Sequence, residues 1–299
     1  MNTSTLRKVV NLSFAIGAAA ITSQAMATAV IQNGFIRAGI SDFGTLGSNR
    51  ATSPGILFDP TGTSTYGVND FLTPGSSSEL FAVTADGGYS KSSNNTGSTS
   101  FANFVLSAIT GTSATATGLS RDGTMRVVNT YSLTTIAGLS KIDITTTLTN
   151  LGTTSLTGLK LLRETDPDPD VNAFGSYFTN NVIVSDDLAC GTGPSSGQTI
   201  CINSTSLFTH KAGINASWPS VNPDLYLSGI NDGNGDYSIG IAFLLGTLAP
   251  SASVTVNYAY NLAADFTVAT GDGAVPLPGT LGLLLAASAG LMFRRKAKA

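Results

Sequence analysis

Apolar and polar side chains alternate along the middle of this chain, and this period of two constrains its fold more than any other feature. In segment 141–148, Ile142, Ile144 and Leu148 fall on one face of an extended chain, and polar residues fall on the other. Successive side chains of a strand point to opposite faces, so the pattern predicts a half-buried strand. The same period recurs in segments 125–131 and 254–260. No segment shows the period of an amphipathic helix, and the many Thr, Ser, Gly, Val and Asn residues favour strands and turns.

Short turn signals separate these segments. They include Asp122-Gly123, Leu151-Gly152 and the Asn- and Gly-rich stretch 232–235. Several short strands spaced by such turns are typical of an antiparallel β-sandwich. There is no internal repeat of fixed period, which argues against solenoids and propellers. We therefore expect residues 28–273 to form one all-β domain with the architecture of an antiparallel β-sandwich.

The first 27 residues have the three parts of a secretory signal peptide. Arg7 and Lys8 precede an apolar stretch over 9–21, and small residues follow, ending in Ala25-Met26-Ala27. Small residues at alternate positions are what signal peptidase accepts, so cleavage is expected after Ala27. The segment predicts export through the Sec translocon, against the alternative of an apolar first helix in a cytoplasmic protein.

Residues 274–299 have the features of a short membrane helix. Proline disrupts a helix interior, so a helix can begin only after Pro278, and the stretch from there to Phe293 carries no charge. At about 1.5 Å per residue this stretch spans roughly 22 Å, short of the ~30 Å hydrocarbon core. Basic residues at the far end, beginning with Arg294 and Arg295, belong on the cytoplasmic side, so the expected topology is N-out, C-in. An ordinary tail anchor is the alternative interpretation.

This tail resembles a PEP-CTERM sorting signal of the type that begins Val-Pro-Leu-Pro. In that family a Pro-x-Pro motif precedes a short transmembrane helix and an Arg-rich end. Gly279 stands where the variant usually has alanine, and the resemblance covers only about the last 25 residues. The residues that match are Val275, Pro276, Leu277 and Pro278 in the motif, and Arg294 and Arg295 in the basic end.

The resemblance implies a route and a destination. A membrane-embedded exosortase is expected to cut near the motif, after a transient stage in which the C-terminal transmembrane helix anchors the protein in the inner membrane. The family implies a Gram-negative bacterium that makes extracellular polysaccharide. The mature protein is then expected at the cell surface, in the outer envelope or in the extracellular matrix.

Removal of the two end segments leaves a strongly acidic protein. Six of the 15 basic residues lie in those segments, whereas all 18 acidic residues lie between them, so nine basic residues remain and the net charge is −9. Nucleic acids and anionic lipids bind basic surfaces, so neither is an expected partner. Cations and neutral polymers such as extracellular polysaccharide stay open as partners.

Cys190 and Cys201 are the two cysteines of the chain. An exported protein folds in an oxidising compartment, where such a pair is expected to form a disulfide that closes the loop 191–200. A loop of this length contributes roughly 2–3 kcal/mol by constraining the unfolded chain. Two cysteines and one histidine are too few for a zinc site.

The acidic stretch 163–170 is the first candidate calcium site. Its prolines prevent a helix, and its carboxylates alternate along the chain, so they repel one another unless water, a basic group or a cation intervenes. Calcium takes six to eight oxygen ligands. The alternative is a solvated acidic loop in which Arg163 pairs locally. The candidate ligands are Asp166, Asp168, Asp170 and Asn172.

A second candidate calcium loop begins at residue 232. Asp232, Asn234 and Asp236 take the first, third and fifth positions of an EF-hand loop. The pattern then fails, because Tyr237 stands where that loop has glycine and Phe243 where it has glutamate. A plain hairpin turn explains the Asn, Asp and Gly residues equally well.

No residue is named as catalytic from the sequence. Segment 193–197 has the letters of a G-x-S-x-G nucleophile elbow, but it lies inside the disulfide loop and lacks the required strand and helix. His210 is expected to be a packed or surface residue. Glycosidases need two carboxylates at a defined separation, and no spacing singles out such a pair.

The sequence thus predicts an exported, exosortase-processed protein with a noncatalytic structural or adhesive β domain that is a candidate for calcium binding. The alternative is a polysaccharide-binding module or a polysaccharide-active hydrolase. Aromatic side chains often stack on sugars, and Trp218, Tyr226 and Tyr237 are the aromatic residues considered for this role, although a lone tryptophan is more often buried.

Overall fold

The computed structural model describes residues 29–47, 54–136 and 139–264. The predicted signal peptide and its cleavage site lie outside the described residues, as do the sorting motif, the transmembrane segment and the basic end. Within the described ranges, no helix is long and apolar enough to cross a membrane. The described residues therefore belong to the domain between the two end segments.

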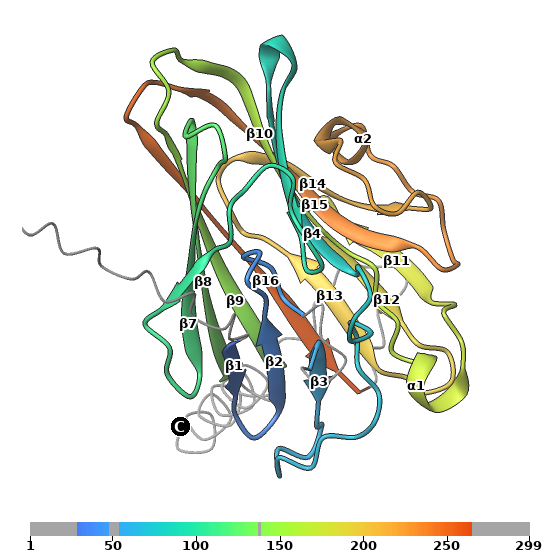
Figure 1. Cartoon of the computed structure of the whole chain (residues 1–299). Helices are drawn as coiled ribbons and strands as arrows, with labels where there is room; N and C mark the ends of the chain where they lie inside the picture. The colour runs from blue at the N-terminus through green and yellow to red at the C-terminus, as the bar shows by residue number, and fades with distance from the viewer. Residues whose placement is uncertain (1–28, 48–53, 137–138, 265–299) are drawn as a thin grey trace, which may run out of the picture.

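The described chain is built from strands, joined by turns and three very short helices (Figure 1). Every pairing within its sheets is antiparallel. The elements are β1 (Ala29–Gln32), β2 (Ile36–Ile40), β3 (Ile56–Phe58), β4 (Glu79–Ala85), the 3-10 helix η1 (Asp86–Gly88), β5 (Tyr89–Asn94), β6 (Val105–Ser107), β7 (Ser113–Leu119), β8 (Met125–Ile136), β9 (Leu139–Asn150), β10 (Leu156–Thr165), α1 (Val171–Phe174), β11 (Asn180–Ser185), β12 (Leu188–Thr192), β13 (Thr199–Asn203), β14 (Thr209–Asn215), α2 (Pro223–Leu227), β15 (Ser238–Leu248) and β16 (Ser253–Ala263).

The larger sheet has eight strands in the order β11-β12-β13-β16-β9-β8-β7-β6. It contains the three segments whose alternation predicts strands: 125–131 in β8, 141–148 in β9 and 254–260 in β16. Ile142, Ile144 and Leu148 are at most 1% exposed, so the predicted inner face of β9 is confirmed. The alternation of apolar and polar residues in the sequence therefore predicts correctly which face of this sheet packs against the core.

The second sheet has five strands in the order β14-β15-β10-β4-β5 and packs against the first, which makes the domain a β-sandwich (Figure 1). Phe81, Leu161 and Phe243 point inward from β4, β10 and β15 and join side chains of the larger sheet in one continuous core. The opposite face of the five-stranded sheet is also covered. There Tyr226 of α2 packs on Leu80, and Trp218 contributes to the same apolar cluster.

A third, small sheet of order β1-β2-β3 adds its apolar side chains to the main core. In Figure 1, β1 and the end of β16 lie at the same end of the molecule. The sandwich thus places the first described strand and the end of the last one at the same end of the molecule (Figure 1).

A buried ion pair lies between the two large sheets. Arg163 and Glu79 are both 0% exposed and form a salt bridge through Nε and Oε1. The Tyr260 hydroxyl donates to Glu79 at 3.0 Å, and Arg163 donates to the Tyr131 hydroxyl at 3.2 Å. Arg163 is the first residue of the acidic stretch 163–170, and the sequence leads us to expect that it pairs locally with an acid of that stretch. That expectation is wrong, since Arg163 points into the core and leaves the following aspartates without it.

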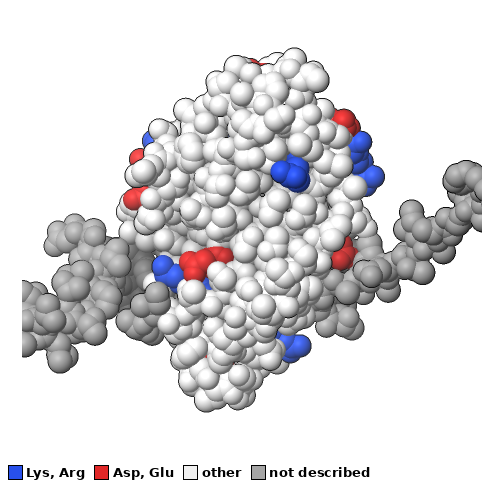
Figure 2. All heavy atoms as spheres, turned by 90° about the vertical axis from the view of Figure 1, so that its left-hand side faces the viewer, with Lys and Arg blue, Asp and Glu red and all other residues white. Residues whose placement is uncertain are grey.

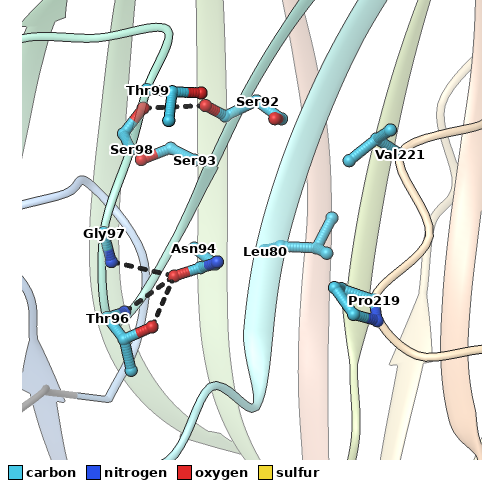
Figure 3. Close-up of a pocket in the computed structure, with 10 residues that line it drawn as sticks. All are labelled: Leu80, Ser92, Ser93, Asn94, Thr96, Gly97, Ser98, Thr99, Pro219 and Val221. Carbon is cyan, nitrogen blue, oxygen red and sulfur yellow. Dashed lines mark hydrogen bonds between the residues drawn. The ribbon is translucent and has the colours of Figure 1, made fainter.

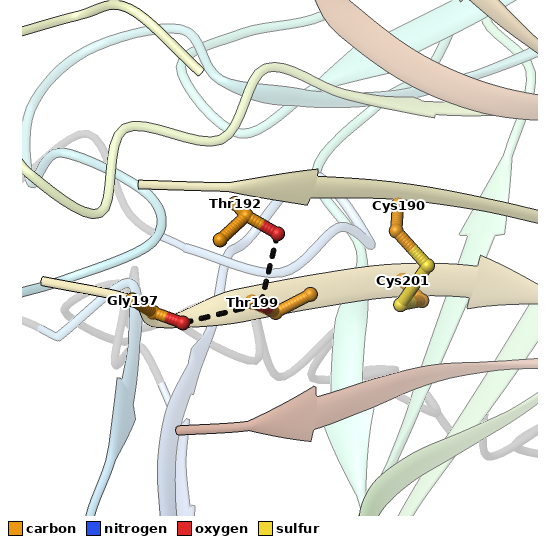
Figure 4. Close-up of a disulfide and its surroundings, with 5 residues drawn as sticks. All are labelled: Cys190, Thr192, Gly197, Thr199 and Cys201. Atoms are coloured by element: carbon orange, nitrogen blue, oxygen red, sulfur yellow. Dashed lines mark hydrogen bonds between the residues drawn. A yellow bond between two sulfur atoms is a disulfide. The ribbon is translucent and has the colours of Figure 1, made fainter. Parts of the chain in front are cut away.

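The predicted disulfide between Cys190 and Cys201 is confirmed (Figure 4). The two cysteines are register partners on β12 and β13. The bond therefore joins adjacent strands near the edge of the eight-stranded sheet, and the hairpin between them contains Gly197, whose φ is +71°. Thr192 and Thr199 extend the cross-strand contact through a hydroxyl hydrogen bond of 2.9 Å.

Candidate metal centre

Three aspartates meet where β10 ends and β15 begins. Thr165, the last residue of β10, pairs with Ile239 near the start of β15, so the residues that follow Thr165 lie beside those that precede β15. Asp166 and Asp168 come from the first segment and Asp236 from the second. Backbone bonds hold the first segment in place, because the Asp166 N–H donates to the Ser78 carbonyl at 2.9 Å. Antiparallel register thus unites residues that lie about 70 positions apart.

Each of the three carboxylates offers an oxygen that lies within 4.8 Å of those of the other two. Their burial is graded: Asp168 is 5% exposed, Asp166 is half-buried and Asp236 is exposed. The cluster therefore leads from the interior of the domain to its surface. This arrangement lets an ion enter from solvent and reach ligands that are themselves fixed.

Burial and mutual repulsion raise the pKa of each carboxyl group. Burial, with added repulsion from Asp236, raises the pKa of Asp166 from 3.8 to about 7. Burial, with repulsion from Asp166 and Asp236, raises the pKa of Asp168 to about 8. Burial also raises the pKa of Asp236. A cation would reverse this cost, because opposite charge favours the ionised form of a carboxyl group.

Two of the carboxylate oxygens have no hydrogen-bond donor among the described residues. They are Oδ1 of Asp166 and Oδ1 of Asp168, both shielded from solvent. Asp168 receives one long hydrogen bond, from the Thr73 hydroxyl to Oδ2 at 3.3 Å. The salt bridges of the described residues engage other acids. A buried polar atom almost always has a partner, and both oxygens are available to water or to a cation.

The chemistry of the donors fits calcium. All are carboxylate oxygens, the ligands that calcium prefers. The other metal-binding residue types are committed elsewhere: both cysteines are in the disulfide, and His210 contacts Asp187 and the Phe208 carbonyl. Three carboxylates would supply three to six of the six to eight oxygens that calcium takes, depending on how many bind through both atoms.

The structure regroups the ligands predicted from the sequence. Asp166 and Asp168 of the first candidate site meet Asp236 of the second. The remaining four have other partners. Asp170 is fully buried and accepts from the backbone N–H groups of Ser195 and Ser196 at 2.8 and 3.0 Å. Asn172 donates to the Val68 carbonyl at 3.0 Å, Asp232 accepts from Ala216 N–H at 2.7 Å, and Asn234 accepts from Asn181 N–H at 2.7 Å.

The other sequence candidates occupy structural positions. The G-x-S-x-G letters over 193–197 form the turn between β12 and β13, with no helix after them. His210 packs against the Phe243 ring. Trp218 is half-buried and its indole N–H donates to the Ser77 carbonyl at 3.0 Å, while Tyr226 is buried and donates to Glu164 at 2.7 Å. Neither Trp218 nor Tyr226 therefore presents an open platform for a sugar.

Both glutamates of the chain are buried, a feature that the sequence did not reveal. Glu79 pairs with Arg163 inside the sandwich, and Glu164 lies on the outer face of the same sheet under α2. Ser238 and the Ser220 N–H also donate to Glu164. Burial raises the pKa of Glu164 to about 7, although these hydrogen bonds act to lower it. Each glutamate is fully engaged in packing the sheet.

A shallow hollow of about 360 Å³ lies on the outer face near β4 and β5 (Figure 3). Ser92, Asn94 and Thr99 stand on one side of it, and Pro219 and Val221 on the other. Its lining contains no charged residue. The Asn94 side-chain oxygen already accepts hydrogen bonds from Thr96 and Gly97 in the adjacent turn. The hollow is neutral and separate from the aspartate cluster.

The surface carries few charges on the face drawn in Figure 2, where acidic and basic side chains are scattered over a mostly uncharged surface. Several of the described basic side chains are paired with acids, such as Lys91 with Asp122 and Lys160 with Asp224. This face has no basic patch of the kind that nucleic acids require.

No protein-family model matches this chain, and no curated protein matches it. Solved structures with a similar arrangement include a bacterial glucoamylase complexed with acarbose, at 11% identity and a TM-score of 0.48 over 80% of this chain. An Escherichia coli protein described as a putative aldose 1-epimerase gives 13% identity and a TM-score of 0.48, with 80% of this chain and all of that chain covered. A galactose mutarotase related enzyme from Lactobacillus acidophilus gives 12% identity and a TM-score of 0.33, with 80% and 98% covered.

This chain spans about a third (32%) of the length of the glucoamylase. Likenesses with TM-scores below 0.5 and identities of 11–13% assign no activity to it. Its function has to be argued from its own residues, of which the aspartate cluster is the most distinctive group.

Proposed function

We propose that this protein is an exported, noncatalytic β-sandwich protein of the cell surface or extracellular matrix, and that its Asp166, Asp168 and Asp236 bind calcium. One observation carries the calcium proposal. A carboxylate that is 5% exposed, Asp168, has an oxygen without a donor and lies within 4.8 Å of two further carboxylates. Calcium would neutralise most of their charge and complete their coordination.

Calcium fits this site better than magnesium. Magnesium demands near-ideal octahedral geometry and keeps most of its water, whereas calcium tolerates irregular sets of carboxylates. An exported protein also meets calcium at concentrations that suit weak sites, for which dissociation constants of about 10⁻⁴–10⁻³ M are usual. We therefore expect an affinity in that range, with protons released on binding because the carboxyl pKa values are raised.

Isothermal titration calorimetry of the purified protein with calcium chloride tests the site. We expect one ion per chain, and at least a tenfold weaker affinity in the Asp168→Asn variant, a loss of about 1.4 kcal/mol. Asp224→Asn is the matched control, because Asp224 is an exposed aspartate whose contact is with Lys160. Equal calcium affinities in the protein and its Asp168→Asn variant would contradict the proposal.

The export proposal is supported by the sequence features of the two ends. The signal peptide directs the chain through the Sec translocon, and the sorting signal presents residues 275–278 to an exosortase. Intact-mass measurement of the protein from the envelope and medium of its native organism tests this. We expect a chain that starts at Thr28 and ends near Val275, alone or with a covalent adduct. A mass that retains Arg294 and Arg295 would refute exosortase processing.

A polysaccharide-active hydrolase is the second candidate function, and the grouping of three carboxylates within 4.8 Å, with pKa values raised by burial, favours it. A glycosidase needs a carboxylic acid that is protonated near neutral pH, and burial raises the pKa of Asp166 to about 7 and that of Asp168 to about 8. Incubation with neutral polysaccharides distinguishes the two functions. New reducing ends that disappear in Asp168→Asn would establish the hydrolase, and their absence supports the noncatalytic proposal.

A further inference from the structure

Three exposed aromatic side chains lie in the segment that leads into β11. Phe174 is 54% exposed, Tyr177 is 53% exposed and Phe178 is 45% exposed. They follow the acidic stretch directly, in α1 and the loop after it. Large aromatic side chains are costly to leave in water, and a group of them on a surface usually marks a site of interaction.

The backbone brings this aromatic segment to the aspartate cluster. Thr179 and Gly235 form an antiparallel bridge, with N–H to carbonyl distances of 2.9 and 3.1 Å in the two directions. The Thr179 hydroxyl also donates to the Gly235 carbonyl at 2.9 Å. In an antiparallel pair, the residue before Thr179 lies across from the residue after Gly235. Phe178 is therefore placed across from Asp236, the exposed member of the cluster.

A calcium ion in the cluster would keep open coordination positions on this side. The carboxylate of Asp168 would bind the ion from the interior of the domain. Asp236 lies at the surface, where solvent reaches the site. The three carboxylates supply at most six oxygens, and calcium can bind up to eight. At least two coordination positions of an eight-coordinate ion would therefore be filled by oxygens of a ligand or of water. An external ligand would therefore contact the ion and the Phe178 ring together.

The charge balance favours neutral oxygens for these positions. Three carboxylates and one calcium ion leave a net charge of −1, within a mature region whose net charge is −9. An acidic ligand would be repelled by this field, whereas hydroxyl groups would not. Sugars offer pairs of neighbouring hydroxyls and a C–H face that packs on aromatic rings.

We propose that calcium at Asp166, Asp168 and Asp236, together with Tyr177 and Phe178, forms a binding site for neutral polysaccharide. The inference rests on the proposed calcium site and names its ligand class. Calcium holds two adjacent sugar hydroxyls, the Phe178 ring packs on the apolar face of that sugar, and Tyr177, the preceding residue, contacts a neighbouring sugar of the polymer. Chelation of calcium therefore abolishes binding, and loss of a ring weakens it while calcium still binds.

The test measures retention of the protein, purified as the full chain, on immobilised mannan, galactan and dextran. Retention is compared in saturating calcium and in excess chelator, for the protein and for Tyr177→Ala and Phe178→Ala. Leu207→Ala is the control, because Leu207 is an apolar side chain that is fully exposed on another loop. Calorimetry with calcium is repeated on each variant.

We expect calcium-dependent retention on at least one polysaccharide, and about three- to tenfold weaker retention in each aromatic variant, as a lost ring contact implies. Calcium affinity should stay unchanged in these variants. Calcium binding without retention would overturn the polysaccharide inference alone, whereas absence of calcium binding would overturn the proposed function as well. Retention that persists in chelator would also overturn the inference, and would point to the neutral hollow beside β5. A change in oligomeric state on loss of the rings would instead assign them to self-association.

Discussion

Replacement of Asp168 by asparagine should stabilise the calcium-free protein at alkaline pH. The pKa of Asp168 is 3.8 in the unfolded chain and about 8 in the folded domain. Between these values the folded state binds more protons than the unfolded state, so stability falls as the pH rises through this window. Asparagine carries no charge at any pH and removes this contribution.

The magnitude can be worked out from the pKa values. One pKa unit corresponds to about 1.4 kcal/mol, so the rise from 3.8 to about 8 would amount to roughly 5–6 kcal/mol for a group that titrates alone. The actual effect is smaller for two reasons. Asp166 and Asp236 repel Asp168 and titrate together with it, so the pKa rise belongs to the three groups jointly, and water reaches them on the side of the exposed Asp236. We therefore expect about 1–3 kcal/mol at pH 8 and a smaller difference at pH 5, where the folded carboxyl group is neutral but the unfolded one, with a pKa of 3.8, is already ionised.

Denaturant unfolding in excess chelator, at pH 5 and pH 8, measures this difference. Other buried acids with raised pKa values, such as Glu164, contribute equally to both proteins and cancel in the comparison. Asp224→Asn, which changes an exposed aspartate in the same way, serves as the control for the substitution itself. A variant that is less stable than the wild type at pH 8 in chelator would refute the reasoning, because it would mean that the Asp168 carboxylate is stabilised without an ion.

Three further substitutions test the packing around the site. Glu79→Gln should cost about 3–5 kcal/mol of unfolding free energy, because it leaves the Arg163 guanidinium buried without its counter-charge; urea unfolding measures it, and a cost below about 1 kcal/mol would contradict the paired state. The double change of Cys190 and Cys201 to serine should cost about 2–3 kcal/mol in thermal unfolding, and a reductant should then have no additional effect on the variant. Asp170→Ala should cost about 2–4 kcal/mol, since the buried Asp170 side chain is lost and two backbone N–H groups lose their acceptor; unchanged amide exchange at Ser195 and Ser196 would show that they have another acceptor.

The strands with one polar face could be predicted from the sequence because their signal is local. In β9, Ile142 and Ile144 alternate with polar neighbours, and this pattern indicates which face of the strand packs against the core. The disulfide could also be predicted, because an exported chain with two cysteines close in sequence offers one pairing. These inferences need no knowledge of which strands are neighbours.

The central strands of the five-stranded sheet gave no such signal. Both faces of β4 and β10 are buried. The main core covers the inner face of these strands, and α2 with its neighbouring loop covers the outer face. Their buried residues therefore run without alternation, and they include Glu79, Arg163 and Glu164, which are usually exposed. The partners that neutralise these groups come from distant strands, so the sequence around each of them does not indicate burial.

The composition of the aspartate cluster depends on long-range register. Spacing along the chain grouped Asp166 and Asp168 with Asp170, and Asp236 with Asp232. Pairing of Thr165 with Ile239 instead brings Asp236 to the first pair, while Asp170 and Asp232 bind backbone N–H groups. The sequence could therefore identify the residues that bear the chemistry, whereas the sheet decides which of them meet.

A crystal structure of the protein grown with calcium tests the proposed site most directly. Three carboxylates with oxygens within 4.8 Å of one another should hold one ion. We expect density for calcium about 2.3–2.6 Å from oxygens of Asp166, Asp168 and Asp236, with anomalous signal at that position. Ordered water alone among the three carboxylates at saturating calcium, or an ion bound at other residues, would contradict the account.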